Sequence, residues 1–85
     1  MYPADAYTIR FATVGDVAAL RRLVELDGPR LFCGPALIAE IGGAPAAAMS
    51  LVDGRVIADP SQSTTVAQQL LRMRRDALRA DIHTA

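Results

Sequence analysis

The stretch LIAEIGGAPAAAMSLVDGRVIAD, residues 37–59, decides the fold, because two short turns divide it into three apolar runs. The turns are Gly42–Gly43 and Asp53–Gly54, and dipeptides of these two kinds connect the strands of β-hairpins. For Asp53–Gly54 we expect a type I′ turn, which needs positive φ at both central residues. The sequence therefore predicts three antiparallel strands in series, at Ala36–Ile41, Ala46–Val52 and Arg55–Asp59. The first two runs are almost continuously apolar, so we expect both faces of the sheet to be covered.

A strand and a helix precede this meander. Polar and apolar residues alternate over Tyr7–Ala12, which is the period of a half-buried strand. Thr13 and Asp16 then have the spacing of a capping box, and Gly28 ends the apolar periodicity that follows them. We expect a helix at Val14–Leu26, with an apolar stripe formed by Val17, Leu20, Leu23 and Val24.

A second helix is expected after the meander. Thr65 and Gln68 have capping-box spacing, and the helical pattern continues over Thr65–Ala80. One face of this helix is apolar, and we expect that face to cover the sheet. The face is formed by Val66, Leu70, Met73 and Ala77, with Ala67, Leu71 and Leu78 beside it.

Together these elements predict an α+β fold in the order β-α-β-β-β-α. The sheet has four strands, is mainly antiparallel and carries one helix on each face. We expect a flexible leader at residues 1–6, a single domain at residues 7–80 and a frayed C-terminus at residues 81–85. A chain of 85 residues has room for one domain, and its low aromatic content leaves it a thin margin of stability.

The composition excludes several classes of protein. Nine arginines balance nine acidic residues and there is no lysine, so the net charge of zero argues against a dedicated nucleic-acid binder. The single cysteine excludes an internal disulfide framework and suits a reducing compartment. No run approaches the ~20 apolar residues of a membrane span, and the N-terminus lacks a signal-peptide pattern. We therefore expect a cytoplasmic protein, and the abundance of alanine and arginine indicates a high-GC bacterial genome.

Two stretches resemble the Gcn5-related N-acetyltransferases. YTIRFATVGDVAALRRLVELD, residues 7–27, is similar to the first strand and helix of that family, whose pattern is I-R-x-A-T-x-x-D-x-x-x-L. Residues 37–59 are similar to the second, third and fourth strands of the family. The resemblance covers residues 7–59, about the first half of that fold, and implies an acetyltransferase half-fold.

The sequence departs from this family where coenzyme A would bind. The family's pyrophosphate loop follows the fourth strand with the pattern Q/R-x-x-G-x-G/A, but here residues 59–71 are DPSQSTTVAQQLL, and no glycine occurs after Gly54. A backbone without glycine does not readily take positive φ or come close to a phosphate. The family's later strands are also missing, so we expect a truncated relative that binds no cofactor. The alternative is a minimal acetyltransferase that uses acetyl-CoA and is completed by dimerisation.

No set of residues favours catalysis or metal binding. Cys33 and His83 are the only thiol and the only imidazole, and together they are too few for a closed zinc site. Asp59 corresponds in position to the general base of the acetyltransferases, and Glu40 is a further carboxylate on a strand. Because Asp59 precedes Pro60, a turn explains it better. We predict no catalytic residue and no metal ligand.

Two groups of polar residues have binding potential. Four hydroxyl side chains precede the second helix, whose N-terminal N–H groups could hold an anion such as a coenzyme A phosphate. Ordinary capping explains the same residues, Ser61, Ser63, Thr64 and Thr65, and we prefer that explanation. Arg72, Arg75 and Arg79, with Arg74 close by, form a basic face on the second helix, which is either solvated or binds an anionic partner.

The last strand of the meander carries the main functional hypothesis. Nothing in the sequence predicts a strand after Arg55–Asp59, so its edge is expected to be open, and Val56 and Ile57 make that edge apolar. We expect this edge (Arg55, Val56 and Ile57), together with the basic helix face, to be an assembly surface for a homodimer or a larger protein complex. The alternative is that the last helix covers the edge and the monomer stands alone.

Overall fold

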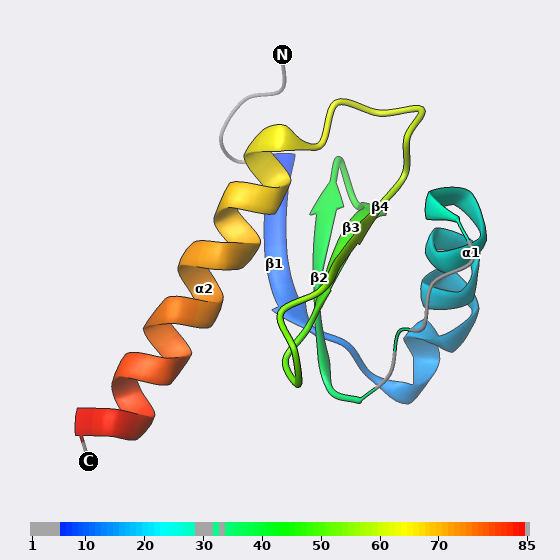
Figure 1. The fold of residues 1–85 in the computed structure, drawn as a ribbon. Coiled ribbons are helices and arrows are strands. Elements are labelled where there is room, and N and C mark those ends of the chain that lie inside the picture. The colour runs from blue at the N-terminus through cyan, green and yellow to red at the C-terminus, as the bar shows by residue number, and fades with distance from the viewer. Residues whose placement is uncertain (1–5, 29–31, 33, 85) are drawn as a thin grey trace.

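The structure, a computed structural model, describes residues 6–28, 32 and 34–84, and the side chains of these as far as residue 80. The described residues form four strands, two helices and one short 3₁₀ turn (Figure 1). These are β1 (Tyr7–Phe11), η2 (Val14–Asp16), α1 (Val17–Asp27), β2 (Ala36–Ile41), β3 (Ala44–Ser50), β4 (Val56–Ala58) and α2 (Thr65–Thr84). The sheet has the order β1-β2-β3-β4 and every neighbouring pair is antiparallel, which confirms the predicted α+β fold.

The sheet lies between the two helices. Figure 1 shows α2 on one side of the sheet and α1 on the other, and α2 leans away from the sheet towards its C-terminus. α2 packs on β2, β3 and β1, whereas α1 packs on β4 and β3. Strand side chains point alternately to the two faces, so Leu37 and Met49 meet Leu71 of α2, while Ile38 and Ile57 meet Leu23 of α1.

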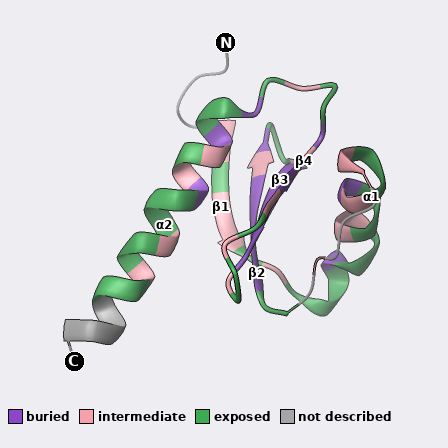
Figure 2. Ribbon diagram, viewed as in Figure 1, coloured by how far each residue is buried: buried purple, intermediate pink, exposed green. Residues whose placement is uncertain are grey.

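The core layer beneath α2 is rich in alanine. Ala39 and Ala47 are fully buried in β2 and β3 and pack in one cluster with Ala67 of α2, whereas Ala48 points to the α1 layer. The buried positions follow the middle of the sheet, as Figure 2 shows in purple. The expectation of a sheet covered on both faces is confirmed.

The two predicted turns have different outcomes. Gly42 and Gly43 have φ of 60° and 86°, as a tight two-residue hairpin requires. The prediction of a type I′ turn at Asp53–Gly54 is wrong. Gly54 has a φ of 75°, but Asp53 does not have the positive φ that this turn needs, since only glycines have positive φ among the described residues. The backbone N–H of Arg55 donates to Asp53 Oδ1 over 2.9 Å, which holds Asp53 in an Asx turn.

The loop between β3 and β4 is consequently longer than predicted. The N–H of Ser50 donates to the carbonyl of Arg55 over 2.8 Å, and the N–H of Gly54 donates back to the carbonyl of Ser50 over 2.9 Å. β3 therefore ends at Ser50 instead of Val52, and β4 has only three residues. At the other end of the chain, α2 continues to Thr84 instead of ending at Ala80.

The face of α2 that covers the sheet is not the predicted one. Ala67 and Leu71 are fully buried and Leu78 is half-buried, whereas Val66 and Met73 are exposed. One residue along a helix is a rotation of about 100°, so the core face is turned by that amount from the predicted stripe. The cap also differs, because Gln68 donates from its backbone N–H and its side-chain Nε2 to Thr64 and not to Thr65.

Candidate interaction surface

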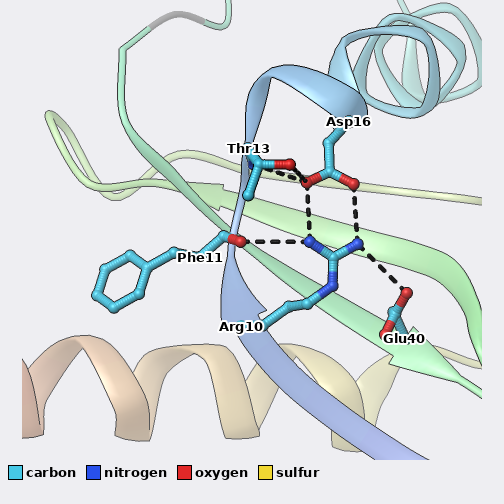
Figure 3. A network of polar contacts seen from close by, with 5 residues as sticks. All are labelled: Arg10, Phe11, Thr13, Asp16 and Glu40. Carbon is cyan, nitrogen blue, oxygen red and sulfur yellow. Dashed lines mark hydrogen bonds and ion pairs between the residues drawn. The ribbon is translucent and has the colours of Figure 1, made fainter.

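The densest polar cluster joins β1, β2 and the start of α1 (Figure 3). The Arg10 guanidinium donates two hydrogen bonds of 2.8 Å to the two oxygens of Asp16 and one of 3.3 Å to Glu40. The backbone N–H of Thr13 donates to Asp16 over 2.7 Å, so the predicted capping box is confirmed. The hydrogen bonds from Arg10, followed by the one from Thr13, hold the pKa of Asp16 far below its usual value. Each charge in the cluster has a partner of opposite sign, so the cluster stabilises the fold.

Sequence analysis missed this cluster. Thr13 and Asp16 are recognisable from their spacing, but Arg10 and Glu40 are 30 residues apart. They meet because the register of β1 and β2 places Arg10 opposite Ile38 and Thr8 opposite Glu40, on the same face of the sheet. The only sign of this cluster in the sequence is that each strand has one charged residue, Arg10 or Glu40, at a position whose side chain points towards α1.

The Asp59 carboxylate accepts hydrogen bonds within the turn that follows β4. Its Oδ1 accepts hydrogen bonds from the N–H of Ser61 over 2.9 Å and from the hydroxyl of Ser61 over 2.6 Å. Its Oδ2 accepts from Gln62 Nε2 over 3.1 Å. These bonds, with that of the Ser61 hydroxyl foremost, lower the pKa of Asp59. A general base works best with a pKa near the working pH, so this environment does not favour that role.

The four hydroxyl residues before α2 do not form one cradle. Ser61 donates to Asp59, and Thr64 is buried and accepts a hydrogen bond of 2.9 Å from Gln68. Ser63 and Thr65 are exposed. The Asp59 carboxylate beside them adds a negative charge close to the start of the helix, which opposes an anion there.

The remaining chemical candidates form no site among the described residues. Cys33 and the side chain of His83 lie outside the described residues. Glu40 is engaged with Arg10. In the part of the chain that the structure describes, no three His, Cys, Asp or Glu side chains could share a metal ion. None of the described helices is long and apolar enough to cross a membrane.

The predicted surface at β4 is smaller than expected. Arg55 is exposed and Val56 is half-buried, but Ile57 is fully buried beneath α1, so its side chain is not available to a partner. The outward N–H of Ala58 donates to Asp27 Oδ1 of α1 over 3.3 Å, which occupies part of the strand edge. The edge of β4 is therefore short and partly covered.

The basic residues of α2 do not act as one set. Arg72 and Arg79 are exposed, but Arg75 is half-buried. Its guanidinium lies against Gly54, where an added Cβ would come within 2.8 Å of Arg75 Nη1. Arg75 thus fixes this side of α2 over the loop between β3 and β4.

Exposed apolar side chains lie on the side of α2 opposite to Arg75. They include Met73, which is 65% exposed, Phe11 at 49% and Val66 at 45%. We call this surface the apolar face, and it consists of Phe11, Val66, Leu70, Met73 and Ala77.

Helix geometry places the apolar face beside β1. Its four α2 residues are on the other side of the helix from Arg75, which lies over the loop between β3 and β4. They therefore face the β1 side of the sheet. Phe11 pairs with Leu37, whose side chain packs towards α2, so Phe11 is on the α2 side of β1. Figure 3 shows its ring pointing away from the Arg10 cluster.

Other exposed apolar side chains do not join this face. They lie in the α1 layer or on the loop between β3 and β4, and they are Val14, Val17, Leu26 and Val52. Phe11 and Met73 could not be recognised as exposed from the sequence, because their positions have the apolar periodicity of a core.

No known protein family, curated protein or solved structure matches this chain. The resemblance to the acetyltransferases therefore depends on the quoted sequence patterns alone.

Proposed function

We propose that this domain is a non-catalytic protein-interaction module, and that it contacts other polypeptides through the apolar face beside β1. One observation carries the proposal: large apolar side chains, with Met73 at their centre, are exposed along α2, although a different face of this helix, with Ala67 and Leu71, packs on the sheet. Contiguous exposed apolar surface rimmed by polar residues is typical of protein-binding sites.

Polar residues border the apolar face on α2, where Gln69 and Asp76 are exposed beside Met73, and this supports the function. Arg72 and Arg79 are exposed on the far side of α2, where they keep the helix soluble when no partner is bound. The proposal keeps the assembly function expected from the sequence but places it at β1 and α2 instead of at β4. An acetyltransferase half-fold remains our hypothesis for the origin of the sheet.

The alternative acetyltransferase function draws less support from the site. It needs a base close to a bound thioester, and the best-placed carboxylate, Asp59, already accepts three hydrogen bonds. No described feature favours that reaction over binding.

Affinity capture from the native cells tests the proposal. Met73→Glu places a charge at the centre of the apolar face, and Ala18→Glu places the same charge at an exposed position of α1, on the other face of the sheet. We expect Met73→Glu to reduce the amount of captured protein at least tenfold relative to the unaltered chain, and Ala18→Glu to leave that amount unchanged. Burying an unpaired charge in an apolar contact accounts for the loss. Both variants should keep the circular dichroism of the original. Equal capture by all three chains would rule out this face as the binding surface.

A further inference from the structure

We infer that the apolar face and the outer edge of β1 bind a second copy of this chain, through antiparallel pairing of the two β1 strands about a two-fold axis at Ile9. The pairing joins two four-stranded sheets into one continuous sheet. This inference rests on the proposed function, because it names the partner of the same face.

The outer edge of β1 presents its backbone for pairing. The carbonyl of Ala6 accepts from Gly42, and the N–H of Ala12 donates to Ala36, each over 2.8 Å. In an antiparallel ladder the hydrogen-bonded residues alternate, so the even-numbered residues of β1 bond to β2. The N–H and C=O of Ile9 and the N–H of Phe11 therefore point outward. No strand of the described part of the chain pairs with this edge.

The same alternation selects the register. A two-fold axis at Ile9 places Ile9 opposite Ile9 of the second copy, in the position where both residues exchange N–H···O bonds. The same register places Phe11 opposite Tyr7 of the second copy, as an aromatic cross-strand pair on the α2 side of the sheet. The carbonyl of Phe11 already accepts one hydrogen bond of 3.2 Å from Arg10, and its second lone pair can accept another from the strand of the second copy.

Charge does not oppose this contact. Thr8 of one copy lies opposite Arg10 of the other, and each Arg10 is neutralised by Asp16 and Glu40 of its own chain. The chain as a whole has no net charge. β1 also lacks the lysine, proline or bulge with which natural edge strands prevent pairing.

The apolar face supplies the area that a strand pair lacks. A stable interface takes about 800 Å² from each partner, which five residues of β1 do not provide. The apolar stripe of α2 begins beside the same edge and extends from Val66 to Ala77, about 17 Å along the helix. A two-fold axis brings the stripes of both copies to one side of the joined sheet, where Met73 and Phe11 become buried. β4 offers a poorer edge, because it has three residues and Asp27 covers part of it.

Analytical ultracentrifugation of the purified full chain tests whether it dimerises. Over micromolar to millimolar concentrations we expect a shift from the monomer mass of 9.0 kDa to twice that value. Met73→Glu should weaken the dimer at least tenfold, and Ala18→Glu should leave it unchanged. A monomer at all concentrations would overturn the inference. If that monomer still captures other proteins in a Met73-dependent manner, the proposed function stands and only the identity of the partner is wrong.

Cysteine cross-linking tests the register. In a Cys33→Ser background, Ile9→Cys places two thiols on residues whose Cα atoms are about 5.5 Å apart, within the range of a disulfide. Phe11→Cys places its two thiols four residues apart along the strands, about 13 Å. Mild oxidation should cross-link Ile9→Cys to a dimer and leave Phe11→Cys monomeric under denaturing electrophoresis. Cross-linking of Phe11→Cys in preference to Ile9→Cys would contradict the pairing.

Discussion

The Asp16 carboxylate is the centre of the polar cluster that joins β1, β2 and the start of α1. It accepts hydrogen bonds from both ends of the Arg10 guanidinium and from the backbone that precedes α1. Its pKa in the folded protein is lowered below the unfolded value of about 3.9. The stabilisation it provides is therefore complete above that value and is lost as the pH falls through the lower folded pKa.

Asp16→Asn should expose this dependence on pH. We expect the midpoint of thermal unfolding at pH 7 to fall by several degrees, because an amide keeps the cap but cannot pair with Arg10 as an anion. The decline of stability below pH ~4 should also become shallower, since one titrating carboxylate is gone. Circular dichroism melts from neutral to acidic pH measure both effects.

Asp76→Asn is the matched control, since Asp76 is exposed on α2. It should follow the original chain at every pH. Asp53 and Asp59 also have lowered pKa values, through hydrogen bonds from Arg55 and Ser61 respectively, so acid still destabilises the Asp16 variant to some extent. The idea fails if Asp16→Asn and Asp76→Asn show the same acid profile.

At the scale of elements, α2 has two apolar faces of different roles. Leu71→Ala should lower the free energy of unfolding by about 2–5 kcal/mol, because Leu71 is fully buried against the sheet. Met73→Ala should change it by no more than about 0.5 kcal/mol, because that side chain is exposed. Urea denaturation at low protein concentration measures both without a contribution from association. Similar losses for the two variants would mean that the helix is rotated relative to this structure.

The two faces of α2 also show where prediction from the sequence stops. Helical periodicity identifies apolar positions, but two faces of α2 have it: the face with Val66 and Met73, and the face with Ala67 and Leu71. Only packing on the sheet decides which of the two faces is buried. The meander was predictable because Gly42–Gly43 takes the positive φ that its turn needs. Asp53–Gly54 was mispredicted because the Asp53 side chain bonds to Arg55 and favours a longer loop.

At the scale of the whole molecule, coverage of the sheet determines which surfaces remain. The helices occupy both faces, so the two strand edges and the outer sides of both helices remain exposed. Asp27 covers part of the β4 edge, whereas the β1 edge borders exposed apolar side chains. This asymmetry follows from the placement of α1 over β4 and β3, and it makes the β1 edge the better candidate for the assembly that we propose.

The same arrangement predicts the response to coenzyme A. The hydroxyl of Ser61 already donates to Asp59, and the Asp59 carboxylate repels a pyrophosphate near the start of α2. Millimolar coenzyme A should therefore leave the midpoint of thermal unfolding unchanged, whereas a ligand present at 100 times its Kd would stabilise the fold by about 2.7 kcal/mol. Asp59→Asn removes the charge and is the informative control. A saturable rise in the melting midpoint of the unaltered chain would contradict the proposed function and favour the acetyltransferase alternative. A rise that occurs only in Asp59→Asn would identify the Asp59 carboxylate as the group that excludes the cofactor.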